Sequence, residues 1–443
     1  MSRENALVDG IRTLSKATGF TASLGDKSPS QFVEVKFESG RSGLLDTSIP
    51  RSAVWAEVLD SLSKANQPAY VEIDPKTNFV TELLCPLSAS VEAITEIADG
   101  VEVELIISHA KHYLRRTNPD FQELLNTLQA ANEQRTMVLV TETPDQHEII
   151  DVRPLPSIRA FPEMIAPPTA EPEPRLIPIT PAKAQELFNQ VNSKICCPAS
   201  PKAPCIPFLY PDDGCWGRAH EMCRLMITSG TQPEKVWIYG NLRTPTPNNP
   251  ACEVNWGWHV APILLVKTTA TDTETWVIDP SMFPGPVSEK TWAGAQGDSS
   301  PLLVHSSASV FHRSRNGIVQ YDDAAYTKTK QVLDTYRNQL KLRSASSNGP
   351  PPYLNCLTKP AGVQFFGTLG PGATGHWYTW GWPAPWHIIW TVMPITPCPG
   401  GPQLSWIVQV ERANASQCTY WITVRNLTSD PVRFECRYDI LSK

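Results

Sequence analysis

Hydrophobic and polar positions in the first 155 residues of the chain form a pattern that occurs twice. In each copy a strand-like run precedes a helix-like stretch, and two further strand-like runs follow. These stretches are residues 32–37, 54–62, 69–73 and 79–84 in the first copy, and residues 100–105, 121–128, 137–141 and 148–152 in the second. We therefore predict a duplicated β-α-β-β region at residues 1–155, with repeats at about 30–88 and 98–156, packed as one α+β region.

No residue of this duplicated region is in a position that suggests chemistry. His109 and His112 stand near Lys111, Arg115 and Arg116. Such a group of polar side chains is typical of a solvated face, and we predict one here.

The rest of the chain divides at two proline-rich stretches. Residues 156–178 and 344–358 are predicted linkers, because frequent proline favours an extended spacer. They separate the duplicated region from a middle domain at 179–343, and that domain from a C-terminal domain at 359–443.

Periodicity in the middle domain predicts three helices and a hairpin. The helices are expected over residues 181–193, 214–227 and 322–343; the central one buries Ala219, Met222, Cys223 and Met226, with Asp212 or Asp213 as its cap. Residues 258–266 and 275–280 read as strands joined by a polar loop. If these strands pair antiparallel, Asp279 returns to the end of the sheet where His259 lies.

Seven of the 14 tryptophans lie in the last 85 residues. They occur in alternating runs such as 406–410 and 420–424, which predict a small antiparallel β-sandwich. Part of the group between Trp377 and Trp390 lies among glycine and proline, so some rings are expected at the surface, where a glycan, a lipid or a protein is the predicted ligand. His376 and His387 beside these rings are interpreted as structural.

Composition describes a globular protein with 41% hydrophobic and 19% charged residues. A net charge of -6 without a basic cluster gives no reason to expect nucleic acid as a partner. No apolar run has the length of a membrane span, and the first residues lack the apolar core of a signal peptide. We expect synthesis in the cytoplasm, with export by a dedicated secretion system as an alternative.

The eleven cysteines show neither paired CxxC nor His-x-x-x-His spacing, so we predict no metal site and no cofactor. Disulfides are expected only if the protein reaches an oxidising space. The odd number leaves one cysteine unpaired in any case, which suits a catalytic thiol.

Thiol catalysis needs a nucleophile, a base for its proton and a group that orients the base. Cys215 is at a predicted helix start, where the helix dipole favours the thiolate, although a lone cysteine is also a common core residue. His259 and Asp279 supply the other two groups. His220, five residues after Cys215 in the same helix, points elsewhere and is a poor base.

Four stretches of the middle domain resemble the bacterial protein-glutaminases. They are Cys215–Met222 (Cys-Trp-Gly-Arg-Ala-His-Glu-Met), Tyr239–Leu242, Trp256–Ala261 and Ile278–Phe283, with a weaker similarity at Val310–Ser314. The resemblance covers about residues 185–340. It implies a fold similar to the core of transglutaminases and papain-like enzymes, preceded here by the duplicated region and followed by the sandwich. It also implies Cys215 as nucleophile, His259 as base and Asp279 as the group that orients the base.

Two features depart from the family. The N-terminal repeat does not look like the expected signal peptide and pro-region, and Trp216-Gly217 replaces an aromatic residue followed by alanine.

The resemblance implies hydrolysis of glutamine side chains in proteins or peptides, with release of ammonia through a thioester. Trp216, Tyr239, Trp256 and Trp258 are the residues expected to wall the substrate slot, although aromatic core positions explain them equally well. A transglutaminase or a cysteine protease would use the same three groups, and an inactive binding protein is a further alternative.

Overall fold

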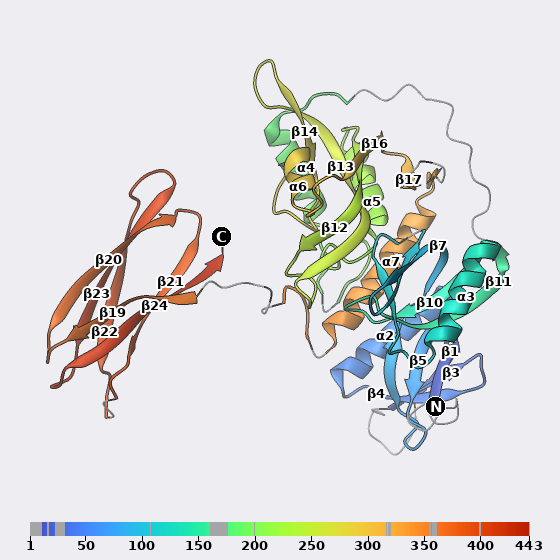
Figure 1. The fold of residues 1–443 in the computed structure, drawn as a ribbon, viewed down its shortest axis with the longest axis horizontal. Helices are drawn as coiled ribbons and strands as arrows, with labels where there is room; N and C mark the ends of the chain where they lie inside the picture. The colour runs from blue at the N-terminus through green and yellow to red at the C-terminus, as the bar shows by residue number, and fades with distance from the viewer. Residues whose placement is uncertain are drawn as a thin grey trace. The chain divides into compact units, whose positions relative to one another are not determined.

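The computed structural model describes residues 11–15, 17–22, 32–106, 108–159, 176–198, 200–315, 317, 320–346, 348–353, 356, 361–397 and 400–442, with backbone only for residues 11–22, 156–159, 361 and 442. The chain forms two compact units, Met1–Cys356 and Leu357–Lys443. Sheets and a smaller number of helices give it a mixed α/β character (Figure 1). Most of the predicted linker 156–178 lies outside the described residues.

The first repeat of the N-terminal region has two three-stranded sheets around one helix. Its elements are β1 (Ile11–Ser15), β2 (Ala17–Ala22), β3 (Phe32–Phe37), β4 (Ser42–Asp46), α2 (Pro50–Lys64), β5 (Ala69–Ile73) and β6 (Val80–Leu84). The sheet orders are β1-β5-β6 and β2-β3-β4. Pro50 is at the start of α2, where its missing N–H removes no helical hydrogen bond, and Trp55, Val58 and Leu59 bury one face of the helix.

The second repeat forms one five-stranded sheet, β11-β10-β7-β8-β9, with its own core under a single helix. Its elements are β7 (Leu87–Ile97), β8 (Gly100–Leu105), β9 (His112–Arg115), α3 (Phe121–Gln134), β10 (Thr136–Glu142) and β11 (Ile149–Arg159). Each repeat therefore has a short strand before its helix, β4 or β9, that the hydrophobic pattern did not predict. Strand β11 also extends into the predicted linker.

The middle region is built on the antiparallel sheet β15-β14-β13-β12-β16. Its elements are α4 (Pro181–Asn192), α5 (Cys215–Thr228), β12 (Glu234–Pro245), β13 (Glu253–Lys267), β14 (Thr273–Val277), β15 (Val287–Ser288), α6 (Glu289–Gly294), β16 (Leu302–Ser307), β17 (Val310–Arg313), β18 (Gln320–Asp322) and α7 (Thr327–Ser344). Helix α5 packs on β13, and its predicted buried face is confirmed.

The predicted hairpin is also confirmed. Strands β13 and β14 pair antiparallel with Ile263 opposite Val277, so the chain returns to the end of the sheet that carries His259. The pairing brings Asp279, two residues after β14, beside that histidine.

Helix α7 lies between the N-terminal region and α5 (Figure 1). Toward α5 the helices are close, because a Cβ on Gly217 would lie 2.5 Å from Val332 Cγ1. Toward the first repeat, Leu342 joins the buried core, and Lys341 forms an ion pair with Glu57 at 2.6 Å. One helix therefore belongs to both packing interfaces.

Two disulfides lie in the first unit, Cys196–Cys205 and Cys252–Cys356. The free cysteines of the described residues are Cys85, Cys197, Cys215, Cys223, Cys418 and Cys436. Cys215 therefore keeps its thiol.

The C-terminal unit has two three-stranded sheets, β19-β24-β21 and β20-β23-β22, with a common core. Its strands are β19 (Ala361–Leu369), β20 (Thr374–Pro383), β21 (His387–Pro394), β22 (Leu404–Glu411), β23 (Gln417–Asn426) and β24 (Val432–Ser442). Trp390 is buried in the core, whereas Trp380 is 71% exposed, so tryptophans occur both in the core and at the surface of this unit. Among the described residues, no helix meets the length and apolarity needed to cross a membrane.

Candidate active site

Cys215 is the first residue of α5, and the glycine before it allows the backbone turn that places it there. Gly214 is the N-cap residue with φ +83°, a left-handed conformation that favours glycine. A Cβ there would also lie 2.2 Å from the Tyr336 ring. The prediction that Asp212 or Asp213 caps the helix is wrong, since α5 has no side-chain cap.

Asp213 holds other segments around the helix start instead. Its carboxylate accepts hydrogen bonds from the backbone N–H groups of Gly214 and His109, and from the hydroxyls of Ser108 and Tyr336. Burial nevertheless raises the pKa of Asp213. The four donors come from two regions of the chain, so this carboxylate connects the N-terminal region to the site.

Cys215, His259 and Asp279 meet in the interior of the first unit. His259 Nε2 lies 2.8 Å from Asp279 Oδ2, and a ring nitrogen of His259 lies within 4.8 Å of Cys215 Sγ. All three residues are at most 2% exposed. The other ring nitrogen, His259 Nδ1, is buried without a hydrogen-bond partner. Because a carboxylate accepts, Nε2 carries the proton and Nδ1 keeps a lone pair, as the base of a thiol needs.

Two further donors hold the Asp279 carboxylate. Trp292 on α6 donates its Nε1–H to Oδ2 at 3.0 Å, and the Ser281 N–H donates to Oδ1 at 3.1 Å. Burial acts to raise the pKa of Asp279, but His259 and Trp292 together hold it below its usual range. Asp279 therefore stays ionised and orients the imidazole.

Burial sets the protonation of the other two groups. It raises the pKa of the Cys215 thiol well above its ordinary value, and it lowers the pKa of His259 despite the Asp279 carboxylate. In this arrangement the pair is a neutral thiol beside a neutral imidazole. The predicted thiolate at the helix start is therefore not the state of the closed site, because desolvation outweighs the dipole.

A segment of the N-terminal region, Ser108–Lys111, covers the thiol. His109 is fully buried, its Nδ1–H donates to the Trp258 carbonyl at 3.1 Å, and its ring stacks 5.5 Å from that of His259. The backbone pairs with β13, since Gly257 N–H donates to the His109 carbonyl and Lys111 N–H to Asn255. The prediction of a solvated face here is wrong: His109 and His112 are both 0% exposed.

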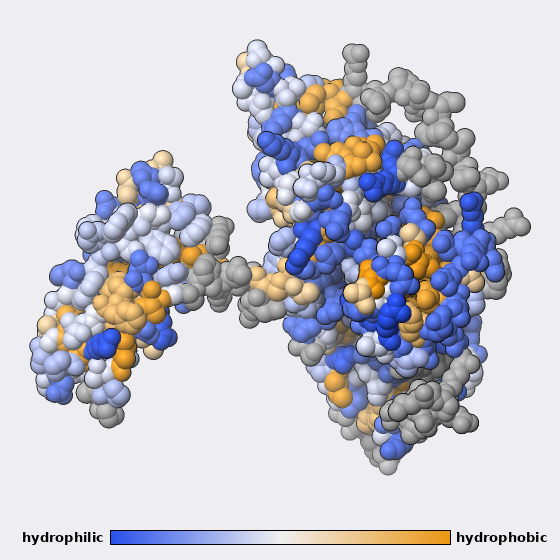
Figure 2. All heavy atoms as spheres, in the orientation of Figure 1, coloured by the Kyte–Doolittle hydropathy of each residue, from blue (hydrophilic) through white to orange (hydrophobic). Residues whose placement is uncertain are grey.

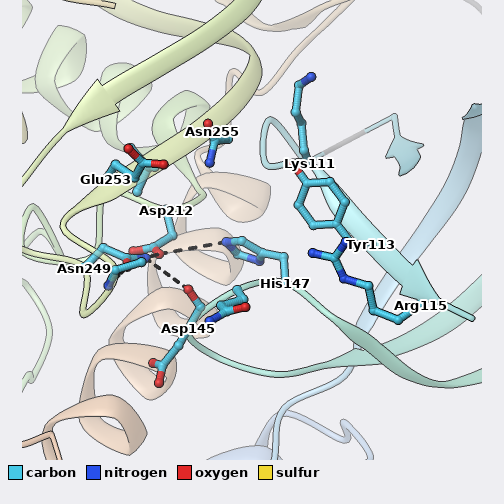
Figure 3. A pocket seen from close by; sticks show the side chains of 12 residues that line it. Lys111, Tyr113, Arg115, Asp145, His147, Asp212, Asn249, Glu253 and Asn255 are labelled. Atoms are coloured by element: carbon cyan, nitrogen blue, oxygen red, sulfur yellow. Dashed lines mark hydrogen bonds and ion pairs between the residues drawn. The ribbon is translucent and has the colours of Figure 1, made fainter. Parts of the chain in front are cut away.

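A buried cluster of His112, Glu142 and His147 stands behind this segment. Glu142 bridges the Nδ1 atoms of the two histidines at 2.5 and 2.8 Å. Figure 3 shows how His147, Asp212 and Asn249 face one another at the junction of the two regions, with His147 Nε2 3.9 Å from Asp212 Oδ1. Asp212 in turn pairs with Arg343 of α7 at 2.6 Å. Charged side chains of the N-terminal region and of the middle region therefore pair with one another beside the site.

The stability of the protein is expected to fall as the pH rises through 9 because of His147. Burial alone would lower the pKa of His147, but Glu142 and Asp212 raise it from 6.5 to about 9. The proton bound to His147 contributes roughly 3 kcal/mol to the free energy of unfolding. This contribution is fully present below pH 6.5, decreases as the pH rises from 6.5 to 9, and is absent above 9. Denaturant unfolding between pH 6.5 and 9.5 measures this loss.

His147→Gln is expected to remove that alkaline loss. His305→Gln is the matched control, because His305 is an exposed histidine that also contacts a glutamate, Glu289. If the free energy of unfolding falls with pH equally in His147→Gln and the wild type between pH 6.5 and 9.5, the buried ion pair does not supply this stability.

The four aromatic residues predicted to wall the slot are all buried. Trp216 and Trp258 lie beside one another with ring centroids 5.9 Å apart and both contact the His109 ring. Trp256 stacks on His259 at 4.5 Å. Tyr239 donates its hydroxyl to the Arg313 carbonyl. The three tryptophans therefore surround the place that His109 occupies, while Tyr239 lies in the same core as Trp216 and Trp258.

His220 is held away from the thiol, as predicted. Its Nδ1 lies 2.9 Å from Lys235 Nζ, and its ring packs on Phe311 and Tyr326.

Sequence reasoning missed Trp292 and His109. Trp292 lies in the six-residue helix α6, which has no distinctive pattern, and its role is visible only in its contacts, the bond to Asp279 and the stacking of its ring on His259 at 5.5 Å. His109 could be noticed as a histidine, but its charged neighbours suggested solvent.

Trp292→Phe is expected to lower kcat by about 10- to 100-fold with little change in KM, because the ring stays and only the hydrogen bond to a charged carboxylate is lost. Steady-state kinetics measures both constants. Trp276→Phe is the control, since its Nε1–H bonds to the exposed Glu274 and not to a residue of the candidate site. Equal losses in the two variants would contradict a positioning role for Trp292.

Comparison with known proteins defines the class of protein as a glutaminase. A family model described as Glutaminase matches residues 184–296, the stretch that contains Cys215, His259 and Asp279. No functionally curated protein matches the chain.

Several solved structures are similar to it. A crystal structure of pro-protein-glutaminase is 26% identical, over 62% of this chain and 98% of that one, with a TM-score of 0.46. A crystal structure of protein-glutaminase is 34% identical, over 36% and 86%, with a TM-score of 0.32. The NMR structure of protein-glutaminase from Chryseobacterium proteolyticum is 35% identical, over 35% and 86%, with a TM-score of 0.32. The chain belongs to the protein-glutaminase family of enzymes.

Proposed function

We propose that the chain converts glutamine side chains of proteins or peptides to glutamate and releases ammonia, with Cys215 as nucleophile, His259 as base and Asp279 as the group that orients the base. A papain- or transglutaminase-like core around α5 and β13 is part of this proposal. The observation that carries it is the ring of His259, with one nitrogen on Asp279 and an unpartnered nitrogen near the thiol.

The reaction has two halves. His259 Nδ1 takes the Cys215 proton while the sulfur attacks the carboxamide carbon, and the oxyanion is held by backbone N–H groups of the first turn of α5. His259 then gives the proton to the leaving ammonia, which leaves a thioester. In the second half His259 activates a water molecule, which splits the thioester to glutamate and the free thiol.

The same proposal makes the full chain latent. Substrate has to reach the sulfur of Cys215, a residue that is 1% exposed beside His109, and the closed site keeps both reacting groups neutral. Displacing Ser108–Lys111 admits substrate between Trp216, Trp256 and Trp258 and hydrates the pair. Hydration favours the thiolate and imidazolium that the reaction needs.

Casein incubated with chain that has been freed of its N-terminal region tests the activity. Ammonia release with intact casein of about one dalton greater mass for each converted glutamine supports deamidation. High-mass cross-linked species would identify a transglutaminase, and peptide fragments a protease. Absence of all three products would favour an inactive binding protein.

For the C-terminal unit we propose a glycan-binding face on the sheet β20-β23-β22. Tyr378, Trp380 and Trp421 are each at least 44% exposed, and Tyr378 stacks on Trp421 at 5.2 Å. Polar groups stand next to these rings, as Trp421 donates to Glu411. Flat rings flanked by hydrogen-bonding groups suit the apolar and hydroxyl faces of a sugar. Figure 2 shows that apolar side chains also gather on the visible face of this unit.

Trp421→Ala is expected to reduce retention on polysaccharide columns by about 10-fold or more, the cost of losing one stacked ring. Trp406→Ala is the control, because Trp406 pairs with the buried Val424 and so belongs to the other face of the sheet. Equal retention of Trp421→Ala and wild type, or binding to lipid vesicles or a protein instead, would sink the glycan proposal.

We also propose that the protein acts outside the cytoplasm after export. The disulfides Cys196–Cys205 and Cys252–Cys356 support this, since such bonds persist in oxidising compartments. Thiol counting on protein recovered from cells and from medium tests it, and fully reduced, exclusively cellular protein would contradict it.

A further inference from the structure

The three side chains at the centre of the closed site are of types that ligate metal ions. Cys215 Sγ and a ring nitrogen of each of His109 and His259 lie within 4.8 Å of one another, and all three residues are buried. Sulfur and imidazole nitrogen are ligands that Zn²⁺ prefers. Ligand atoms of a tetrahedral zinc site lie about 3.3–3.6 Å apart, so these atoms have to approach by no more than about 1.5 Å.

Both imidazoles have a lone pair for a metal. His109 Nδ1–H donates to the Trp258 carbonyl and His259 Nε2–H to Asp279, so each ring has one nitrogen without a proton. These nitrogens, His109 Nε2 and His259 Nδ1, are buried and have no hydrogen-bond partner. His109 Nε2 lies 3.4 Å from Asp213 Oδ1, but both atoms are acceptors and form no bond.

The surroundings of the two rings are those of metal-bound histidines. A metal-ligating histidine almost always donates its other N–H to a carboxylate or a backbone carbonyl, which fixes the ring and its tautomer. Asp279 does this for His259, and the Trp258 carbonyl does it for His109. Trp292 donates to Asp279 and so holds in place the carboxylate that orients His259.

The neighbouring cluster of His112, Glu142 and His147 differs in this respect. There the carboxylate already occupies one nitrogen of each histidine, and Ser108 occupies His112 Nε2. That cluster is a satisfied ion-pair network, whereas the set at the thiol has two unused lone pairs.

We propose that the closed chain binds one Zn²⁺ ion through Cys215, His259 and His109, and that the ion locks the N-terminal region onto the active site. The Cys215 thiol loses its proton to solvent as the sulfur–zinc bond forms, and the neutral imidazoles donate existing lone pairs, so no electron is transferred. Water takes the fourth position. No sequence motif announces this site, because its ligands come from three separate segments, and the earlier prediction of no metal is replaced by this proposal.

The regulatory meaning of the lock rests on the proposed function, but the site itself does not. With zinc bound, neither the sulfur nor the base is free, and His109 ties the two regions together. Withdrawal of zinc by a chelator removes that tie while leaving Asp213 and the ion pairs in place.

The test is a Co²⁺ titration of the full chain after treatment with a chelator. We expect a thiolate-to-cobalt charge-transfer band that saturates at about one equivalent, is displaced by Zn²⁺, and is absent in Cys215→Ser. His109→Ala is expected to weaken binding at least about 100-fold, more than the loss of an outer-shell partner. His305→Ala, which removes an exposed histidine elsewhere, should bind as the wild type does.

Circular dichroism shows whether each variant folds, and His109→Asn replaces His109→Ala if the latter does not. A wild-type chain without the band, or His109 variants that bind Co²⁺ as tightly as the wild type, would overturn the proposal. The titration needs no substrate. A band without deamidation of casein by the freed chain leaves the site standing and refutes the proposed function, and deamidation without a band does the reverse.

Discussion

Replacing Cys215 with alanine is expected to abolish ammonia release from casein, with a loss of about 10⁴-fold or more. In the proposed mechanism the thioester forms on this sulfur, and no other described cysteine lies in the His109–Cys215–His259 group. The substitution removes one sulfur at the start of α5, where the backbone is already fixed by Gly214 and Asp213. We therefore expect the fold to survive, which unfolding curves of the chain with its N-terminal region removed will show.

Cys223→Ala is the matched control for this loss. Cys223 is a buried, free cysteine on the same helix, two turns beyond Cys215. It should retain the activity of the wild type even if it costs some stability. Ammonia release that persists in Cys215→Ala, or disappears equally in Cys223→Ala, would rule out Cys215 as the nucleophile.

Removal of the N-terminal region is expected to have the second large effect, an increase in the rate of deamidation. Cutting the chain within residues 160–175 and removing residues 1–159 should raise the rate of deamidation by about 10²-fold or more. If the N-terminal region docks on the active site with a free energy of about 3 kcal/mol, the site is open in only about 1% of molecules. Ser108, His109 and Lys111 each bond across the interface, and Arg343 reaches the backbone of Pro144 from α7.

Adding the N-terminal region back to the freed enzyme tests whether its docking causes the inhibition. Isolated residues 32–159 should inhibit the freed enzyme, and the same fragment with His109→Ala should inhibit it less, because the ring stacked on His259 is gone. Full activity of the uncut, chelator-treated chain would contradict a latent state. The rate must be followed at a fixed pH, since burial lowers the pKa of His259 and raises that of Cys215 in the closed chain.

Local pattern was enough to predict the elements that carry Cys215, His259 and Asp279. The buried positions of α5 follow from its three- and four-residue spacing, and the hairpin from two apolar runs around a polar loop. A hairpin fixes which ends of its strands are neighbours, so the meeting of His259 with Asp279 required no knowledge of the remaining fold. That is why these side chains could be named from the sequence.

Side chains whose environment is made by distant segments could not be predicted in this way. Lys111 and His112 looked solvated because they are polar and adjacent, yet Lys111 Nζ bonds to Asn241 and His112 to Glu142. Asp213 has a strong capping preference, but bonds from Ser108 and Tyr336 use its carboxylate instead. In each case a tertiary contact overrides a local preference.

The sharing of α7 between two interfaces bears on how the proposed latent state can be released. Leu342 is part of the hydrophobic core of the first repeat, and Asn338 and Lys341 bond to Ser61 and Glu57 of α2. We therefore expect a single nick in the connecting segment to leave two fragments that still adhere, so that the proposed latent state ends only when the amino-terminal fragment is digested. A protease that destroys that fragment is expected to activate the enzyme, and one that only cleaves the connection is not.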